Sequence, residues 1–320
     1  MTAPRYVPLL DREGIAEAAR QTHGLWGYGR PLAEHVEHTV AQVALAGPEL
    51  LRYVGLVDAD RDRDRGLVAA SKRYGLLFRA GGREARVLGI GAVFTKDDER
   101  GKGHAPALIR AMVAEASDLG YAAAILYSDI DAAYYARLGF VALPAIDHFS
   151  RVDALPTAGA LAFRPANEGD LDRLIAWYEA SWAASPDATR PVRSRALLRY
   201  FSLRNRVAGM VLSDAGRDVG YLLATPDDPL RDLPEPRPEA LLWVDEWSAP
   251  GVDPARVLAT IRAVAERAAA REIGLWLRPG QDLAPFRSAP RSASFPMILP
   301  LAPGLTVDPA RDHLGSFEHF

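Results

Sequence analysis

One order of helices and strands occurs twice along this 320-residue chain, and this repeat constrains the fold more than any other feature. In the first half, apolar spacing predicts a strand, two helices, three paired strands, a further helix and another strand. From residue 161 the same order begins again. The chain is long enough for two domains of ordinary size. We therefore predict an α+β protein with domains at residues 1–152 and 153–320, each a mixed, mostly antiparallel twisted sheet flanked by helices.

The composition excludes several classes of protein. A hydrophobic fraction of 49% with 25% charged residues is typical of a folded globular chain, and a net charge of -3 argues against a nucleic-acid partner. The absence of Cys excludes disulfides, thiolate catalysis and Cys-ligated zinc. The start of the chain lacks a signal-peptide pattern, and no stretch of 18 apolar residues is free of charge. We expect a cytoplasmic protein that binds no membrane.

The segment DERGKGHAPAL at residues 98–108 is the clearest binding motif. Gly101 and Gly103 let the backbone pass close to a ligand, and the helix that begins here directs free N–H groups and a positive dipole end at an anion. Arg100 and Lys102 would add charge-assisted contacts. The segment matches neither a Walker A loop nor a Rossmann fingerprint. On these residues alone, a solvated turn at the start of a helix remains an alternative.

Two motifs together resemble those of the GCN5-related N-acetyltransferases. RGKGHA, at residues 100–105, is similar to the family's (Q/R)-x-x-G-x-(G/A) motif and follows a long strand at 85–95, as it does in that family. The family's second signature, a strand followed by Tyr-x-x-x-Gly-Phe, is matched by Tyr135 to Phe140. The resemblance covers about residues 5–148. The tandem layout is similar to that of the mycothiol synthases and the enhanced-intracellular-survival aminoglycoside acetyltransferases.

The resemblance implies acetyl-CoA as the co-substrate. Its pyrophosphate would lie on the loop before the helix, which gives as expected contacts Arg100, Gly101, Lys102, Gly103, His104 and Ala105. The pantetheine arm would follow the strand at 85–95, where Val93 and Phe94 offer main-chain groups, one of them as an oxyanion-hole donor. We expect no metal, because His35 and His38 lie three apart on a helix without a third ligand in view.

The family's chemistry implies direct attack of an amine on the thioester, without a covalent enzyme intermediate. Tyr135 matches the motif tyrosine and is the expected acid for the leaving CoA thiolate. A lysine-like amine, with a pKa of about 10, is neutral in only about one molecule in a thousand near pH 7, so a base must take its proton. The strand at 85–95 lacks the Glu that many members carry. Asp129 is the favoured base, and the remaining candidates are Asp131, His23, Glu34 and the terminal carboxylate of Phe320. Asp131 has a second interpretation as the N-cap of a short helix.

A loop at residues 23–31 is expected to wall the acceptor pocket. The residues predicted to line this pocket are His23, Trp26, Tyr28 and Glu34. Acidic residues around its expected mouth (Glu34, Glu37, Asp129 and Asp131) favour a cationic small-molecule amine. Two alternatives remain: acetylation of a peptide or protein amine, and a non-catalytic CoA-binding or scaffold protein.

The second half departs from the family pattern. Its equivalent helix follows a loop without the Arg or the spaced glycines, and Asp253 would repel a pyrophosphate. Asp253 is instead a good N-cap, and Pro254 is a good first helical residue. We therefore predict a degenerate domain without a CoA loop. It would buttress the first domain, close one side of the acceptor pocket, or form the surface of a homodimer.

Overall fold

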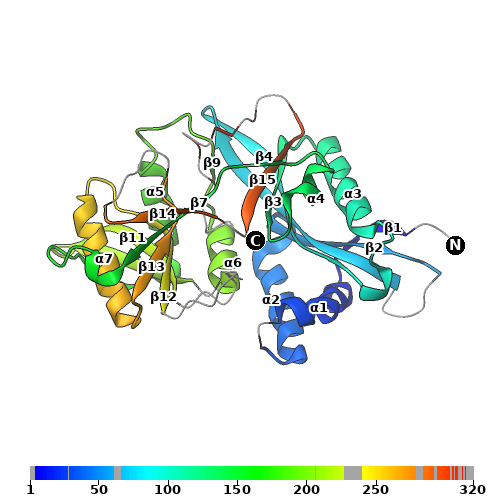
Figure 1. Ribbon diagram of the computed structural model, residues 1–320, viewed down its shortest axis with the longest axis horizontal. Coiled ribbons are helices and arrows are strands. Elements are labelled where there is room, and N and C mark those ends of the chain that lie inside the picture. Colours follow the sequence, from blue (N-terminus) through cyan, green and yellow to red (C-terminus); the bar gives the residue numbers. More distant parts are fainter. Residues whose placement is uncertain are drawn as a thin grey trace.

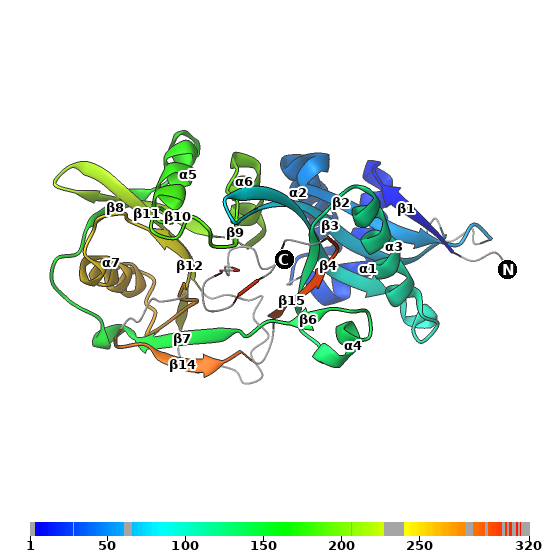
Figure 2. The ribbon, with the colours of Figure 1, turned by 90° about the horizontal axis from the view of Figure 1, so that it is seen from above.

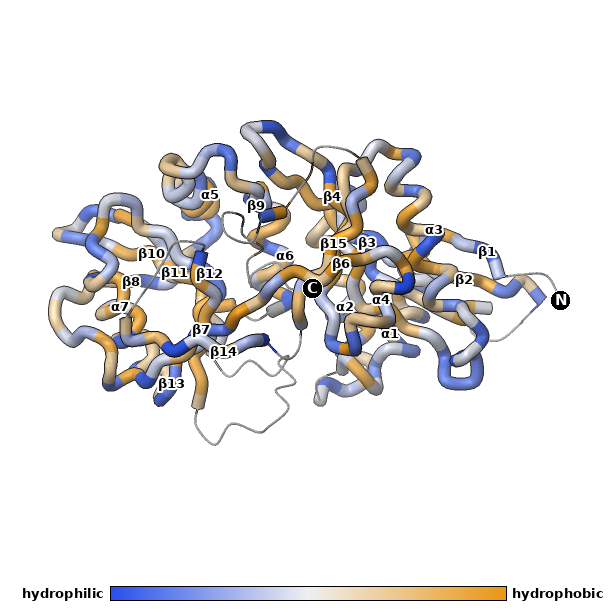
Figure 3. The backbone as a smooth tube through the Cα atoms, turned by 45° about the horizontal axis from the view of Figure 1, so that its top comes forward, coloured by the Kyte–Doolittle hydropathy of each residue, from blue (hydrophilic) through white to orange (hydrophobic). Residues whose placement is uncertain are grey.

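The computed structural model describes residues 4–27, 29–60, 66–205, 207–226, 240–278, 284–291 and 294–302, with Leu305, Val307, Asp308, Asp312 and Leu314 beyond them. Two sheets lie one after the other along the long axis of the molecule, each with helices against it (Figure 1). In Figure 3 the strands are mainly orange and many outer turns are blue, as expected for sheets that bury apolar faces. The two mixed sheets with flanking helices confirm the predicted α+β class.

The first sheet has the order β1-β2-β3-β4-β5-β15-β6, with β9 paired to β3. Its strands are β1 (Arg5–Leu9), β2 (Leu51–Val57), β3 (Leu67–Ala80), β4 (Arg83–Thr95), β5 (Ala123–Ser128), β6 (Val141–Ala142), β9 (Arg190–Pro191) and β15 (Phe295–Pro300). β4 and β5 are parallel, whereas the other described pairs of this sheet are antiparallel. Its helices are α1 (Arg12–Trp26), α2 (Leu32–Leu50), α3 (His104–Asp118) and α4 (Ala132–Ala136), and a 3-10 turn, η2 (Asp97–Glu99), follows β4.

The two faces of this sheet carry different helices. The side chain of Arg73 on β3 points to α3, where its Nε donates to Glu115 at 2.8 Å. The next residue, Tyr74, faces the opposite side and packs in the core cluster that contains Leu50 of α2. This alternation is the ordinary period of a strand. Regular helix in α2 breaks at Gly47, which has a φ of 74° and precedes a proline.

The second sheet has the order β14-β7-β13-β12-β11-β10-β8. Its strands are β7 (Ile146–Arg151), β8 (Ala162–Pro165), β10 (Ala208–Asp214), β11 (Arg217–Pro226), β12 (Leu241–Ser248), β13 (Glu272–Leu275) and β14 (Arg287–Pro290). The helices of this half are α5 (Leu171–Ala180), α6 (Arg195–Asn205) and α7 (Pro254–Arg267), with 3-10 turns η3 (Val152–Ala154) and η4 (Glu168–Asp170). β12 and β13 are parallel, as β4 and β5 are in the first sheet.

The two sheets exchange strands across residues 152 and 153. β7 precedes this point in the chain but pairs with β13 and β14 of the second sheet. β15 follows it by more than a hundred residues, yet lies between β5 and β6 of the first sheet. In Figure 2, β7 runs next to β14 at one side of the second sheet, while β15 lies among the strands of the first. Each half therefore needs a strand from the other to complete its sheet.

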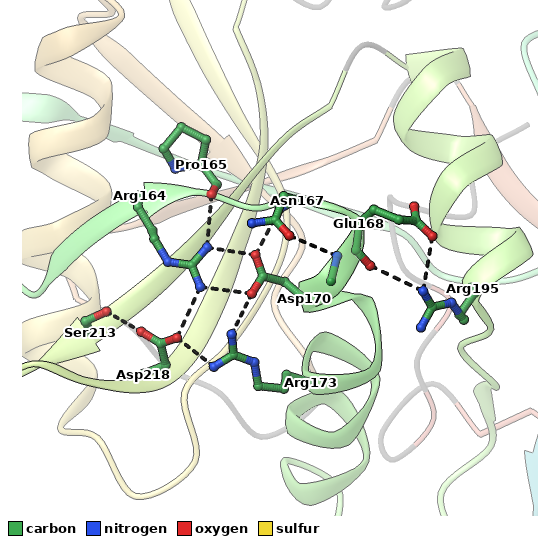
Figure 4. A network of polar contacts seen from close by, with 10 residues as sticks. Arg164, Pro165, Asn167, Glu168, Asp170, Arg173, Arg195, Ser213 and Asp218 are labelled. Carbon is green, nitrogen blue, oxygen red and sulfur yellow. Dashed lines mark hydrogen bonds and ion pairs between the residues drawn. The ribbon is translucent and has the colours of Figure 1, made fainter.

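A polar network fastens the start of α5 to the second sheet (Figure 4). Arg164 on β8 donates to both carboxylate oxygens of Asp170, at 2.7 and 2.9 Å. Asp170 is buried, and its hydrogen bond with Arg164 holds the pKa of its carboxyl well below the usual range. Arg173 joins Asp170 to Asp218 at 2.7 Å on each side. Because every charge in the network has a partner of opposite sign, we interpret it as structural.

Candidate active site

The loop before α3 holds both motif glycines in the left-handed region, with φ values of 79° at Gly101 and 82° at Gly103. No heavy atom lies within 4 Å of the position that a Cβ would take at either glycine, so the backbone is open on that side. α3 begins at His104 and has no side-chain cap. Its first N–H groups therefore point at the open side of the loop, which is the arrangement that binds an anion.

Glu99 is a member of this loop that the sequence analysis missed. Its side chain is buried, and its carboxylate accepts from Lys102 Nζ at 2.9 Å and from His104 Nε2 at 3.0 Å. Arg100 is exposed and forms an ion pair with Asp97 at 2.8 Å. The sequence signal for these contacts was the position of Glu99, an acidic residue that lies three residues before Lys102 and five before His104. Glu99 thus fixes two of the predicted contact residues beside the start of α3, where Ala105 also lies.

β4 and β5 separate next to this loop. Their parallel register runs from Val87↔Ala123 to Ile90↔Leu126, and β4 continues to Thr95 without a further β5 partner. Just past the last pair, Ala92 has a positive φ of 49°, a strained value for a residue with a side chain. A register shift of β3 against β4 accompanies it. Such bulges redirect a strand and are frequent beside active sites. Val93 and Phe94 lie in this redirected segment.

Tyr135 lies on α4, the helix that follows β5. Its ring packs edge-on against Tyr134, with centroids 5.0 Å apart, and against Phe140 at 6.2 Å. Burial, together with the nearby Tyr134 and Asp129, raises the pKa of Tyr135 to about 12. The phenol is therefore protonated near neutral pH, a state that suits a proton donor.

The two acidic residues after β5 differ in their contacts. Asp131 accepts from the N–H of Ala133 at 2.9 Å, which confirms its interpretation as the N-cap of α4. Asp129 is exposed and accepts a hydrogen bond from the hydroxyl of Ser294. Ser294 comes immediately before β15, so the strand exchange brings it to the end of β5.

The predicted acceptor loop is shorter than expected. α1 continues through Trp26, so His23 and Trp26 are helical, and the expectation of a loop from residue 23 is wrong. Gly24 does not end the helix, because the cap lies at Gly27, whose N–H donates to the carbonyl of His23 at 2.8 Å. His23 Nε2 lies 2.7 Å from the carbonyl oxygen of Arg30.

Glu34 is the one remaining predicted pocket residue that the structure describes. Glu34 is exposed in the first turn of α2. Tyr28 and Phe320 lie outside the described residues. Within the part of the chain that the structure covers, no group of three potential metal ligands is present. Among the same residues, no helix has the length and apolar character needed to span a membrane.

The corresponding region of the second half differs at the start of its helix and at the point where its parallel strands separate. Asp253 accepts from the N–H of Ala255 at 2.9 Å, which confirms it as the N-cap of α7, with Pro254 as the first helical residue. β12 and β13 separate after Val244↔Leu275. Arg278, beyond the end of β13, reaches back to the carbonyl oxygen of Trp247 on β12 at 3.4 Å. The loop before α7 keeps one open left-handed glycine, Gly251, but Asp253 stands at the N-cap position that Gly103 holds before α3, so among the described residues the pair of open glycines is not repeated.

The diverging parallel strands, the bulge and the glycine loop at the start of α3 define an acyltransferase fold of the GNAT type. Residues 26–142 match the model of the acetyltransferase (GNAT) domain family. This N-terminal segment is therefore similar to the acetyltransferase domains of the GNAT family. GNAT domains use acetyl-CoA, and acetyl transfer is the reaction that this similarity supports.

Solved structures share the fold across nearly the whole chain. The GCN5-related N-acetyltransferase from Kribbella flavida is 19% identical, with 93% of this chain and 72% of that chain covered and a TM-score of 0.65. A probable N-acyltransferase from Enterococcus faecalis V583 is 15% identical, with 94% and 73% covered and a TM-score of 0.70. Eis1 from Mycobacterium abscessus is 16% identical, with 93% and 74% covered and a TM-score of 0.57. No curated protein matches the chain.

Proposed function

We propose that the chain transfers the acetyl group of acetyl-CoA to a primary amine of a small molecule by direct attack. One observation carries the proposal. The open glycine loop follows β4 and the neutral Tyr135 follows β5, and these two parallel strands separate between them. Because parallel strands end at the same edge of a sheet, this geometry supports an anion-binding loop and a proton donor on either side of one ligand.

Each group then has a defined task. The N–H groups at the start of α3 bind the pyrophosphate, and main-chain groups of Val93 and Phe94 hold the pantetheine arm and polarise the thioester carbonyl. Acetyl-CoA supplies the activated acyl group. As the amine nitrogen bonds to the acetyl carbon, the carbon–sulfur bond breaks, and Tyr135 gives its proton to the leaving sulfur.

A base must accept the proton that the amine loses, and we propose Asp129 for this task. Its position directly after β5 supports the assignment, and its charge contributes to the raised pKa of Tyr135, so the two groups are close. The proton that Asp129 receives balances the proton that Tyr135 gives to the thiolate. Assembly as a homodimer and a cytoplasmic location stay predictions.

The direct test is release of CoA from acetyl-CoA against a panel of amines. A thiol reagent follows the release without background, because the chain contains no Cys. Amine-dependent CoA release, with the acetylated amine identified by mass spectrometry, is the expected result. Binding of acetyl-CoA without release against every amine of the panel would contradict the proposal and favour a CoA-binding scaffold.

A further inference from the structure

The buried face of α2 is polar in its first half. The buried side chains of the helix are His35, Thr39 and Gln42, followed by Ala46 and Leu50. This spacing places them on one helix face, against β3 and α1. An apolar stripe is the usual filling of such a face, so the three polar groups at its start require partners.

His35 has no such partner within the described part of the chain. It is only 6% exposed, and neither of its ring nitrogens makes a hydrogen bond there. Its ring lies 5.4 Å from that of His23. An unsatisfied buried polar group costs about 1–3 kcal/mol. Burial is the main cause that lowers the pKa of His35 to about 4, and the positive charges of nearby side chains contribute to this value.

Lys72 on β3 lies near enough to His35 for its charge to lower the pKa of the imidazole, and it has no carboxylate contact among the described residues. Its ammonium is 3.4 Å from Gln42 Oε1 and 5.8 Å from the centre of the Tyr53 ring. Burial, together with the charge of Arg204, lowers the pKa of Lys72 to about 7. This corner of the protein therefore combines a partly buried cation with an unpartnered imidazole and lacks a counter-charge.

The corner adjoins the reaction centre of the proposed function. Lys72 pairs with Gly91 across β3 and β4, next to the bulge at Ala92. Neighbouring strands lie about 4.8 Å apart, so Lys72 begins one strand away from the segment assigned to the thioester. Its side chain lies on the α2 face of the sheet, because the following residue, Arg73, points to α3.

We propose that Lys72 and His35, with Gln42, bind an acidic group of the acceptor, a carboxylate or a phosphate. The acceptor would then be an amine that also carries an acid, such as an amino acid. This inference rests on the proposed function and replaces the expectation of a purely cationic acceptor. That expectation loses support in any case, since Glu37 forms an ion pair with Arg12 and Asp131 caps α4.

Matched pairs of acceptors test the subsite in the full chain. Each amino acid of a panel is compared with the amine that its decarboxylation gives, and phosphoethanolamine is compared with ethanolamine, through kcat/KM for CoA release. Because the subsite would form hydrogen bonds to a charged group, we expect kcat/KM to be about 10- to 100-fold higher for the acid-bearing member of at least one pair. The pair that shows the preference distinguishes carboxylate from phosphate.

The Lys72→Met variant should reduce this preference to within about threefold, chiefly through a higher KM for the acid-bearing acceptor. Arg151→Met removes one positive charge from the exposed surface of the second sheet and is the matched control. Equal kcat/KM values for both members of every pair in the wild type would overturn the subsite. An equal loss for both members in Lys72→Met would do so too.

A binding measurement separates failure of the subsite from failure of the proposed function. The imidazole NMR signals of His35, assigned with His35→Gln, are titrated with pH in the presence of N-acetylated amino acids or inorganic phosphate. The titratable groups that face His35 are His23, Arg30, His38 and Lys72. A bound anion should raise the pKa of His35 in the wild type but not in Lys72→Met. This response without any CoA release contradicts the proposed function alone, whereas CoA release without this response overturns the subsite.

Discussion

Tyr74 of β3 and Tyr200 of α6 share a hydrogen bond of 2.8 Å between their hydroxyls in the core between the two sheets. Both side chains are fully buried, and burial raises the pKa of each, so both phenols remain neutral. Phe201 stacks on Tyr74 with ring centroids 6.4 Å apart. One apolar cluster contains all three residues together with Leu50 and Tyr178. The two halves of the chain are therefore joined by a continuous core.

The losses of stability caused by replacing the two tyrosines one at a time should add up to more than the loss caused by replacing both together. Tyr74→Phe removes the hydrogen bond of the buried Tyr200 hydroxyl, which costs about 1–3 kcal/mol of unfolding free energy, and Tyr200→Phe removes the same bond from the other side. The double variant should lose less than the sum of the two single losses, because no orphaned hydroxyl remains. Urea unfolding followed by tryptophan fluorescence measures the three losses. Strictly additive losses would show that the bond contributes nothing.

Gly103→Val should abolish binding of acetyl-CoA while the protein stays folded. A valine at a φ of 82° strains the loop and covers the open backbone at the start of α3. We expect the Kd for acetyl-CoA, measured by calorimetry, to rise by at least about 100-fold. Gly120→Val is the matched control, because Gly120 has a φ of 74° and open surroundings but lies beyond the opposite end of α3. Similar affinities of the two variants would refute the loop assignment.

Tyr135→Phe should lower kcat by about 100-fold and leave the Kd for acetyl-CoA nearly unchanged, because loss of a general acid affects proton transfer and not binding. Since the pKa of Tyr135 is about 12, the phenol keeps its proton up to pH 10, and its ionisation should produce no fall in kcat below that pH. Tyr134→Phe, which alters the neighbouring ring, serves as the control. A rate for Tyr135→Phe within twofold of the wild type would remove it as the acid.

Asp129→Asn should remove the acidic limb of the pH–rate profile if Asp129 takes the amine proton. An amide at this position cannot accept a proton from the amine, so any part of the profile that depends on Asp129 as the base is lost. Asp131→Asn is a suitable control, because Asn caps a helix as well as Asp does and the N-cap of α4 is retained. An acidic limb that survives in Asp129→Asn assigns the base to another group.

Residues 1–152 expressed alone should not form a folded, monomeric acetyl-CoA-binding domain. The fragment lacks β15, so the edge of β5 and the faces that pack against the second half are left uncovered. We expect aggregation, with solubility and acetyl-CoA binding restored when residues 153–320 are co-expressed. A soluble monomeric fragment that binds acetyl-CoA would show that β15 is dispensable.

Features set by a few neighbouring residues were predictable. The left-handed glycines of the loop, the caps at Asp131 and Asp253 and the break at Gly47 depend on backbone preferences and on side chains one to three positions away. The end of α1 was misjudged, because Gly24 and the aromatic residues after it suggested a loop while packing against α2 extends the helix. Tertiary contacts of this kind override local preference.

The sequence by itself determined two α+β units, the half that carries the glycine loop, and the family that this half resembles. Only the tertiary structure decided that β7 and β15 change sheets and that the charge of Lys72 acts on the buried His35, with no carboxylate contact to either side chain in the described part of the chain. Ser128 and Phe295 pair across 167 positions of the chain, and a short apolar strand fits the pattern of either sheet equally well. Which sheet each strand joins depends on the apolar surface that the strand buries there once both sheets have formed. Residues that are neighbours in the sequence do not determine this burial.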